Sequence, residues 1–287
     1  MIRSRSDDMF EFGIAAVLIA VLLAMLIPLW YVLMVSVTPL SAGANASTLV
    51  PSQATLEAYN QLLSQPQFVR STINSLLIVF LGVPLNMILT VLTAYPLSRK
   101  TLPGRKYITM FVLITFLFNA GLIPTYLLVR NLGLINTYPA VILPGAISVY
   151  NTLVMKNFFE NLPEGLEEAA RIDGANDFQV LWYVVLPLSR PILLTIGLFY
   201  TVAHWNEFFL PLIFLTNSKL MPLPVLLHNI LQGVSMSELV ESNVVSVTSP
   251  QALRMAAVIL TMIPMLLVYP WIQRHFIHGV LIGGVKE

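Results

Sequence analysis

The chain alternates between long apolar stretches and shorter polar segments. Six stretches are long enough to cross a bilayer, which takes about 20 mainly apolar residues in a helix. They cover residues 12–37, 71–97, 107–129, 132–155, 191–218 and 255–273. Prolines inside these stretches predict kinked helices. The pattern predicts an all-α integral membrane protein with six transmembrane helices.

Composition agrees with this class. Hydrophobic residues make up 57% of the 287 residues and charged residues only 10%, and the mean hydropathy is +0.80. Such values are typical of helices that face lipid. The net charge of +1 gives no information about nucleic-acid binding, and the sequence contains no nucleic-acid-binding motif. The chain has no cysteine, which excludes a disulfide framework and thiolate metal sites.

The distribution of Lys and Arg predicts that both termini are cytoplasmic. With the N-terminus inside, the outer segments hold only four of the 15 basic residues, and inner loops normally carry the excess. The outer ones are Arg70, Arg130, Lys219 and Arg254. The first stretch is about twice as long as the apolar region of a signal peptide. We therefore expect it to be a retained helix, and not a leader cleaved after Ala46.

These expectations divide the chain into three parts. Residues 1–70 form a cytoplasmic tail, the first transmembrane helix and an external loop; residues 71–273 form the transmembrane core, with a cytoplasmic loop at 156–190; residues 274–287 form a cytoplasmic tail. The outer segments 38–70 and 217–254 are polar. Each is either a surface for a partner or a simple connector.

The cytoplasmic loop predicts two short helices joined by a sharp turn. Asn161 can cap the first helix and Pro163 fits its first turn. Gly174 can supply the left-handed residue that ends it, so the helix is expected over residues 162–173. Asn176 or Asp177 can cap the second helix, which is expected to end near residues 186–187.

Small side chains lie on one side of the first helix. Leu166, Ala169 and Ala170 recur at helical spacing, and alanines allow close approach of another backbone. The segment therefore predicts a docking element for a protein partner. An amphipathic helix lying on the membrane surface is the alternative.

This loop closely resembles the EAA loop of permease subunits of bacterial ATP-binding cassette importers. The resemblance rests on Glu168-Ala169-Ala170, Asp173-Gly174-Ala175 and Leu186-Pro187-Leu188 at their observed separations. In that family the loop forms a coupling helix that sits in a groove of the ATPase subunit, and the permease has the type I importer fold. The resemblance implies an ATPase-coupling role for Glu167, Glu168, Ala169, Ala170, Arg171, Asp173, Gly174, Ala175, Leu186 and Pro187.

The sequence contains no Gly-x-x-x-x-Gly-Lys-Ser/Thr loop for ATP phosphates, no Ser/His/Asp arrangement and no His-Glu-x-x-His helix. We therefore expect a non-catalytic subunit with no bound cofactor. The resemblance implies that ATP and Mg bind to two partner ATPase subunits. It further implies a homologous second permease, an extracytoplasmic sugar-binding protein and a place in the bacterial inner membrane, surrounded by lipid.

The remainder of the chain resembles carbohydrate-uptake permeases. The similar residues are Trp205-Asn206, Pro211-Leu212 and the ending at 269–286. The nearest branch handles oligosaccharides and polysaccharide fragments, and alginate is one candidate cargo, although no residue specifies a uronic acid. Two alternatives stay open: an importer of peptides or amino acids, because the EAA loop reports coupling and not cargo, and a proton-coupled secondary transporter.

Glu207 is the only Asp, Glu, Lys or Arg inside the six stretches. It lies about 16 residues beyond Pro191, or about 24 Å along a helix, near the outer end. Glu207 can line the pathway, contact the binding protein or a neighbouring helix, or simply be solvated at the interface. Trp205 is either an interfacial anchor or a platform for a sugar ring. With Asn206, these residues are the candidate pathway or binding-protein contacts.

Overall fold

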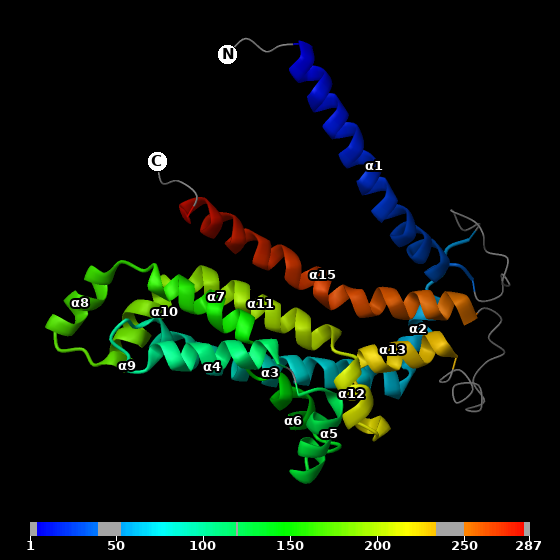
Figure 1. Cartoon of the computed structure of the whole chain (residues 1–287). Coiled ribbons are helices and arrows are strands. Elements are labelled where there is room, and N and C mark those ends of the chain that lie inside the picture. The colour runs from blue at the N-terminus through cyan, green and yellow to red at the C-terminus, as the bar shows by residue number, and fades with distance from the viewer. Residues whose placement is uncertain (1–4, 40–52, 119, 234–249, 284–287) are drawn as a thin grey trace. The chain divides into compact units, whose positions relative to one another are not determined.

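The computed structural model describes residues 5–39, 53–118, 120–233 and 250–283 (Figure 1). Within these ranges the regular structure is helical. The helices are α1 (Arg5–Ser36), α2 (Glu57–Ser64), α3 (Pro66–Ser98), α4 (Arg105–Leu117), α5 (Leu122–Asn131), α6 (Tyr138–Ile142), α7 (Val149–Glu160), α8 (Glu164–Ile172), α9 (Asp177–Val180), α10 (Leu186–Leu188), α11 (Arg190–Asn206), α12 (Phe209–Phe214), α13 (Leu223–Gln232) and α15 (Pro250–Gly283). Parts of the predicted outer segments, residues 40–52 of the first and 234–249 of the second, lie outside the described residues.

The described helices supply six candidate membrane spans. Three are single helices, Phe10–Ser36, Pro66–Ser98 and Pro250–Val268. Three more are pairs of shorter helices joined at a bend: α4 with α5, Tyr138–Gly145 with α7, and Asp177–Leu188 with α11. The prediction of six spans therefore agrees with the described chain when each bent pair counts as one span, although only α11 of the last pair lies in a predicted apolar stretch.

The third, fourth and fifth apolar stretches are broken helices, where hydropathy alone suggests continuous ones. In the third, Gly121 has φ of 84° and directly precedes α5. In the fourth, Pro144 lies in a 3-10 turn, and the Ser148 side chain accepts a hydrogen bond from the amide of Asn151 to start α7. In the fifth, α11 ends at Asn206, and α12 begins at Phe209.

The chain forms two compact units, Met1–Val69 with Leu226–Ile263, and Arg70–Val225 with Pro264–Glu287. In the first unit, side chains along α1 from Phe10 to Trp30 are exposed, as expected for a lipid-facing helix. Its far end is held by polar contacts. Ser36 Oγ lies 2.5 Å from the Tyr59 hydroxyl of α2, and Gln251 Nε2 of α15 donates to the Tyr31 hydroxyl at 3.0 Å.

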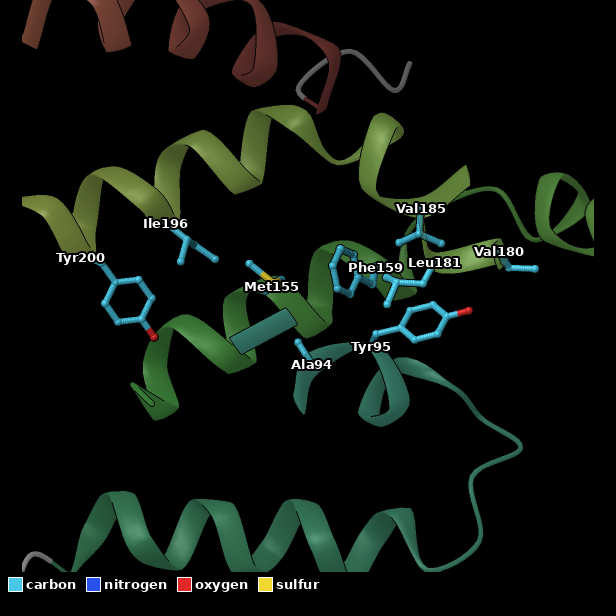
Figure 2. Close-up of a cluster of buried hydrophobic side chains, with 9 residues drawn as sticks. All are labelled: Ala94, Tyr95, Met155, Phe159, Val180, Leu181, Val185, Ile196 and Tyr200. Carbon is cyan, nitrogen blue, oxygen red and sulfur yellow. The ribbon is translucent and has the colours of Figure 1, made fainter. Parts of the chain in front are cut away.

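The second unit has an apolar core that joins α3, α7 and α11 to the segment following α8 (Figure 2). Its buried members are Ala94, Tyr95, Met155, Phe159, Val180, Leu181, Val185, Ile196 and Tyr200. The rings of Tyr95 and Phe159 meet edge to face, with centroids 6.3 Å apart. Because Val180, Leu181 and Val185 belong to the predicted cytoplasmic loop, this loop is packed into the transmembrane core.

A ladder of buried polar contacts joins α3 to α11 beside this core. Asn86 Nδ2 lies 3.0 Å from His204 Nε2, and the Thr90 and Tyr200 hydroxyls lie 2.7 Å apart. Gly82, one turn before Asn86, leaves space for the His204 ring, because a Cβ there would lie 2.6 Å from His204 Nε2. These contacts hold the two helices in one register.

Gly82→Ala should therefore destabilise this helix pair. The added methyl group displaces the His204 ring and breaks its hydrogen bond to Asn86, and overpacking of this kind costs about 1–3 kcal/mol. Gly197→Ala is the matched control on α11, since its nearest neighbour would be Met87 Sδ at 4.0 Å. Thermal unfolding of the purified variants in detergent should show a lower Tm for Gly82→Ala only. Equal Tm values would contradict the close packing at Gly82.

Candidate coupling segment

Helix α8 begins later than the sequence suggests. Its N-cap is Pro163, and it runs over Glu164–Ile172, so the prediction that Asn161 caps it is wrong. Asn161 instead ends α7, where its Nδ2 donates to the carbonyl of Asn157 at 2.7 Å. The reason is that α7 continues through Glu160, so Asn161 is the C-cap of α7 and its side chain binds a carbonyl of the last turn.

The turn after α8 confirms the role expected for Gly174. Its φ is 88°, in the left-handed region that favours glycine. The amide of Gly174 donates to the carbonyl of Arg171, and the amide of Ala175 donates to the carbonyl of Ala170, both at 3.0 Å. This pair of bonds is the Schellman motif. Ala170 and Ala175 both pack against the apolar core, which fixes the end of α8 to the bundle.

Asn176 caps the second helical segment, as predicted. Its side chain accepts from the amide of Gln179 at 2.9 Å, and the Gln179 side chain accepts from the amide of Asn176 at 2.8 Å. This reciprocal capping box starts α9. The chain continues through a π-helical turn at Leu181–Val185 into α10, Leu186–Leu188, with Pro187 in its first turn. The predicted end near residues 186–187 agrees with this arrangement.

Two neighbouring glutamates of α8 differ in their surroundings. Glu167 is 6% exposed and forms an ion pair with Arg99, directly after α3. Glu168 is exposed, as are Ala169 and Ile172. The structure therefore places Glu168 and its exposed neighbours on the free face of α8, and Glu167 against the chain's own α3–α4 connection.

The remaining residues predicted for coupling are distributed over both faces. Arg171, Asp173, Gly174 and Pro187 are exposed, whereas Ala170, Ala175 and Leu186 are half-buried. Arg171 and Asp177 form an exposed ion pair at 2.9 Å that joins α8 to α9. An exposed pair of this kind stabilises by about 0–1 kcal/mol at most. The attachment of α8 thus depends on the apolar core and on Glu167.

Basic residues of the α3–α4 connection complete the site, and sequence reasoning missed them. Arg105 forms an ion pair with Glu160 at the end of α7, and its Nε donates to the carbonyl of Leu97 at 2.7 Å. Lys156 also pairs with Glu160, at 2.9 Å. The basic residues at 99–106 predicted only that this loop faces the cytoplasm. Nothing in the neighbouring sequence indicates their acidic partners.

An open cavity of about 420 Å³ lies between the end of α3 and the α8–α9 segment. Tyr95, Arg99, Arg171, Asp177 and Phe178 are among its lining residues. Within the described part of the chain, no group of three or more His, Asp or Glu side chains converges as metal ligands. The lining of the cavity combines apolar side chains with two arginines and one aspartate.

The second predicted group, Trp205, Asn206 and Glu207, lies where α11 ends. Asn206 is exposed, and Trp205 is only 3% exposed, which leaves little of its ring for stacking on a sugar. Glu207 is half-buried, and its Oε1 accepts hydrogen bonds from the amides of Phe209 and Leu210, each at 3.1 Å. Glu207 therefore caps α12, a role that the sequence reasoning did not anticipate. A contact of these residues with cargo or with a binding protein stays a prediction.

Comparison with known proteins identifies the family. Residues 54–281 match the family described as the binding-protein-dependent transport system inner membrane component. The chain belongs to this family of transporter permease subunits, as its EAA-like loop indicated. Its all-helical architecture is the type I permease fold.

Two relatives with similar sequences are involved in polysaccharide transport. The polygalacturonan/rhamnogalacturonan transport system permease protein YtcP of Bacillus subtilis (strain 168) is 38% identical over 244 residues, covering 83% of this chain and 84% of YtcP. A chain of a bacterial ABC transporter involved in import of the acidic polysaccharide alginate superposes with a TM-score of 0.88 at 31% identity, covering 96% of this chain and 99% of that one.

A second solved structure shares the fold alone. It is a bacterial alginate ABC transporter in complex with alginate pentasaccharide-bound periplasmic protein. One of its chains superposes with a TM-score of 0.59 at 15% identity, covering 94% of this chain and 96% of that one.

The capping role of Glu207 can be tested by two substitutions. Glu207→Ala removes the acceptor for both amides at the start of α12 and should destabilise the protein by about 1 kcal/mol, as the loss of a helix cap does. Glu207→Gln keeps a side-chain oxygen and should change stability by less than about 0.5 kcal/mol. Thermal unfolding in detergent measures both. A loss of stability as large in Glu207→Gln as in Glu207→Ala would show that the charge, and not the cap, is what matters.

Proposed function

We propose that this chain is the permease subunit of an ATP-driven, binding-protein-dependent importer of acidic oligosaccharides or polysaccharides in the bacterial inner membrane. Its family supports the permease role. The observation that carries the coupling mechanism is the α8–α10 segment, which lies at one end of the second unit and presents exposed Glu168 and Ala169 (Figure 1). The distribution of Lys and Arg supports a cytoplasmic position for both termini.

The exposed face of α8 is the docking surface for an ATPase subunit. Ala169 lets a partner backbone approach closely, and Glu168 offers a carboxylate to a basic group. The partner ATPases bind ATP and Mg and close on them; the docked segment moves, and the permease changes between inward-open and outward-open states. A second, homologous permease and an extracytoplasmic binding protein complete the assembly.

Acidic saccharides are the cargo class that the relatives support. YtcP is named as a permease of a polygalacturonan/rhamnogalacturonan transport system, and the alginate transporter is involved in the import of an acidic polysaccharide. A free carboxylate in the pathway would repel such a cargo. The two backbone amides that bind Glu207 Oε1 leave its negative charge in place, so we do not assign Glu207 to direct contact with an acidic cargo.

The two alternatives have less support. A peptide or amino-acid importer would use the same coupling segment, but the similar proteins described above concern polysaccharides. For a proton-coupled carrier, Glu207 would be the coupling carboxylate, but its Oε1 accepts hydrogen bonds from two backbone amides at the start of α12. No observation on the described residues favours either alternative.

Gly174→Val tests the coupling segment. A β-branched residue at φ of 88° is strained by about 1–3 kcal/mol, which should misplace the end of α8 while the apolar core keeps the protein folded. ATP-dependent uptake by the reconstituted complex should fall at least about tenfold, as expected from a strain of this size. Gly174→Asn is the matched control, because asparagine tolerates the left-handed region. Wild-type uptake by Gly174→Val, at equal amounts in the membrane, would refute the coupling role.

The cargo class is tested by uptake into vesicles that hold the complete complex with its binding protein. Oligogalacturonates or alginate oligosaccharides should be taken up in an ATP-dependent manner, whereas neutral maltooligosaccharides of the same length should not compete. Preferential uptake of neutral sugars would exclude the acidic class. Uptake of peptides alone would exclude saccharides as a whole.

A further inference from the structure

The end of α3 and the residue that follows it contact both halves of the coupling segment. Tyr95 lies in the last turn of α3, Arg99 directly follows Ser98, and the Arg99 guanidinium lies over the Tyr95 ring. The Tyr95 hydroxyl donates to the carbonyl of Asp177, the first residue of α9, at 3.3 Å. Arg99 Nη1 donates to the carboxylate of Glu167 in α8. The C-terminal end of α3, with Arg99 directly after it, thus binds both α8 and α9.

Within the described chain, the positive charge of Arg99 has few compensating groups around it. Its guanidinium carbon lies 4.3 Å from the centroid of the Tyr95 ring, in a cation-π contact. Among the described residues, no acceptor lies within hydrogen-bonding distance of its buried Nε and Nη2 atoms. The carboxylate of Glu167 is therefore the group that compensates the charge of Arg99.

Glu167 is equally dependent on Arg99. The side chain of Glu167 is 7% exposed and that of Arg99 is 21% exposed, so the pair is largely removed from water. Loss of one partner from a buried ion pair leaves an uncompensated charge and is strongly destabilising. By contrast, the Arg171–Asp177 pair is 44% and 77% exposed and holds α8 to α9 only weakly.

The α3–α4 connection is also held at its other end. Arg105, at the start of α4, binds the carbonyl of Leu97 in α3 and pairs with Glu160 of α7. The connection between Arg99 and Arg105 is therefore anchored to α3, α7 and α8. A displacement of α8 cannot be absorbed by a loose loop at this point.

We propose that Tyr95 and Arg99 form the link that passes movement of α8 and α9 to the transmembrane helix α3, and that Glu167 belongs to this link. The two adjacent glutamates then have separate tasks. Glu167 binds inside the permease, whereas Glu168 faces the ATPase. This inference rests on the proposed coupling function and assigns to Tyr95, Arg99 and Glu167 a positioning role.

Thiol labelling separates the two glutamates, because the chain has no cysteine of its own. Glu167→Cys and Glu168→Cys are introduced singly, and inside-out vesicles holding the complex are treated with a membrane-impermeant maleimide, before and after the ATPase subunits are stripped off. Labelling is read on the band of this subunit. Glu168→Cys should react after stripping and be protected by the ATPases, whereas Glu167→Cys should react at least about tenfold more slowly in both states.

The labelling outcomes distinguish the two proposals. Rapid labelling of Glu167→Cys that only the ATPases suppress would place Glu167 on the docking face and overturn the internal link. Labelling of Glu168→Cys that the ATPases do not affect would contradict the proposed docking face of α8. The link to α3 itself is tested by substitutions of Arg99 and Glu167, singly and together.

A double-mutant cycle tests the pair itself in the reconstituted complex. Arg99→Ala and Glu167→Ala should each lower uptake per ATP hydrolysed by about tenfold or more, because each leaves a buried charge. The double variant should be no worse than either single one, since coupled residues are not additive. The charge exchange Arg99→Glu with Glu167→Arg should recover part of the loss. Effects that multiply in the double variant, with the complex assembled in normal amounts, would refute the link.

Tyr95→Phe tests the contact with α9. It keeps the ring beneath Arg99 and removes the hydroxyl that binds the Asp177 carbonyl, so uptake per ATP should fall by only about two- to fivefold, the loss of one hydrogen bond. Tyr95→Ala removes both contacts and should approach the loss seen in Arg99→Ala. Unchanged coupling in both Tyr95 variants would exclude Tyr95 from the link.

Discussion

Packing of the α8–α10 segment onto the transmembrane helices is the interaction on which the proposed function depends. Val180, Leu181 and Val185 are buried against Tyr95 and Phe159. Burial of large apolar side chains stabilises each by about 1.5–3 kcal/mol, far more than the exposed ion pair between Arg171 and Asp177. The segment therefore behaves as part of the helix bundle and not as a free loop, which is the physical requirement for passing force from a bound partner into the membrane.

The broken spans follow a second constraint, which is the satisfaction of backbone polar groups away from water. A helix that stops within an apolar surrounding leaves free amides, and each needs a partner. Ser148 N donates to the Tyr200 hydroxyl at 3.1 Å, the amides of Phe209 and Leu210 bind Glu207, and the Leu223 amide binds Ser75 Oγ at 2.8 Å. Side chains thus bind amides at the starts of α7, α12 and α13.

Polar contacts also join segments that are far apart in the chain. Asn74 Nδ2 of α3 donates to the carbonyls of Lys219 and Met221, at 2.9 and 3.0 Å, and its Oδ1 accepts from the Tyr138 hydroxyl at 2.9 Å. At the other end of the same helix, Tyr95 and Arg99 hold the coupling segment. Helix α3 therefore carries specific contacts at both ends.

Local signals in the sequence were sufficient for the class of protein and for the turns. Long apolar stretches predict membrane spans because lipid accepts no unpaired backbone, Gly174 predicts the left-handed stop, and Asn176 predicts the second cap; each depends on residues within one or two turns. The spacing of the motifs in the cytoplasmic loop, residues 168–188, likewise indicated the family. The positions at which apolar stretches break depended on partners from elsewhere in the chain, as with Ser148 and Tyr200.

The roles of individual polar and charged residues were decided by the folded structure. Asn161 fits an N-cap, yet α7 reaches it first and uses it as an end. Glu167 and Glu168 are equivalent by sequence, but the distant Arg99 buries one and leaves the other exposed. Glu207 appears as an isolated membrane acid, whereas the fold turns the chain back on it so that two amides bind its carboxylate. Hydropathy and motif spacing report what a residue is. Which groups bind it depends on the folded backbone around it, two to four residues away for Glu207 and Asn161, and on Arg99, 68 residues away, for Glu167.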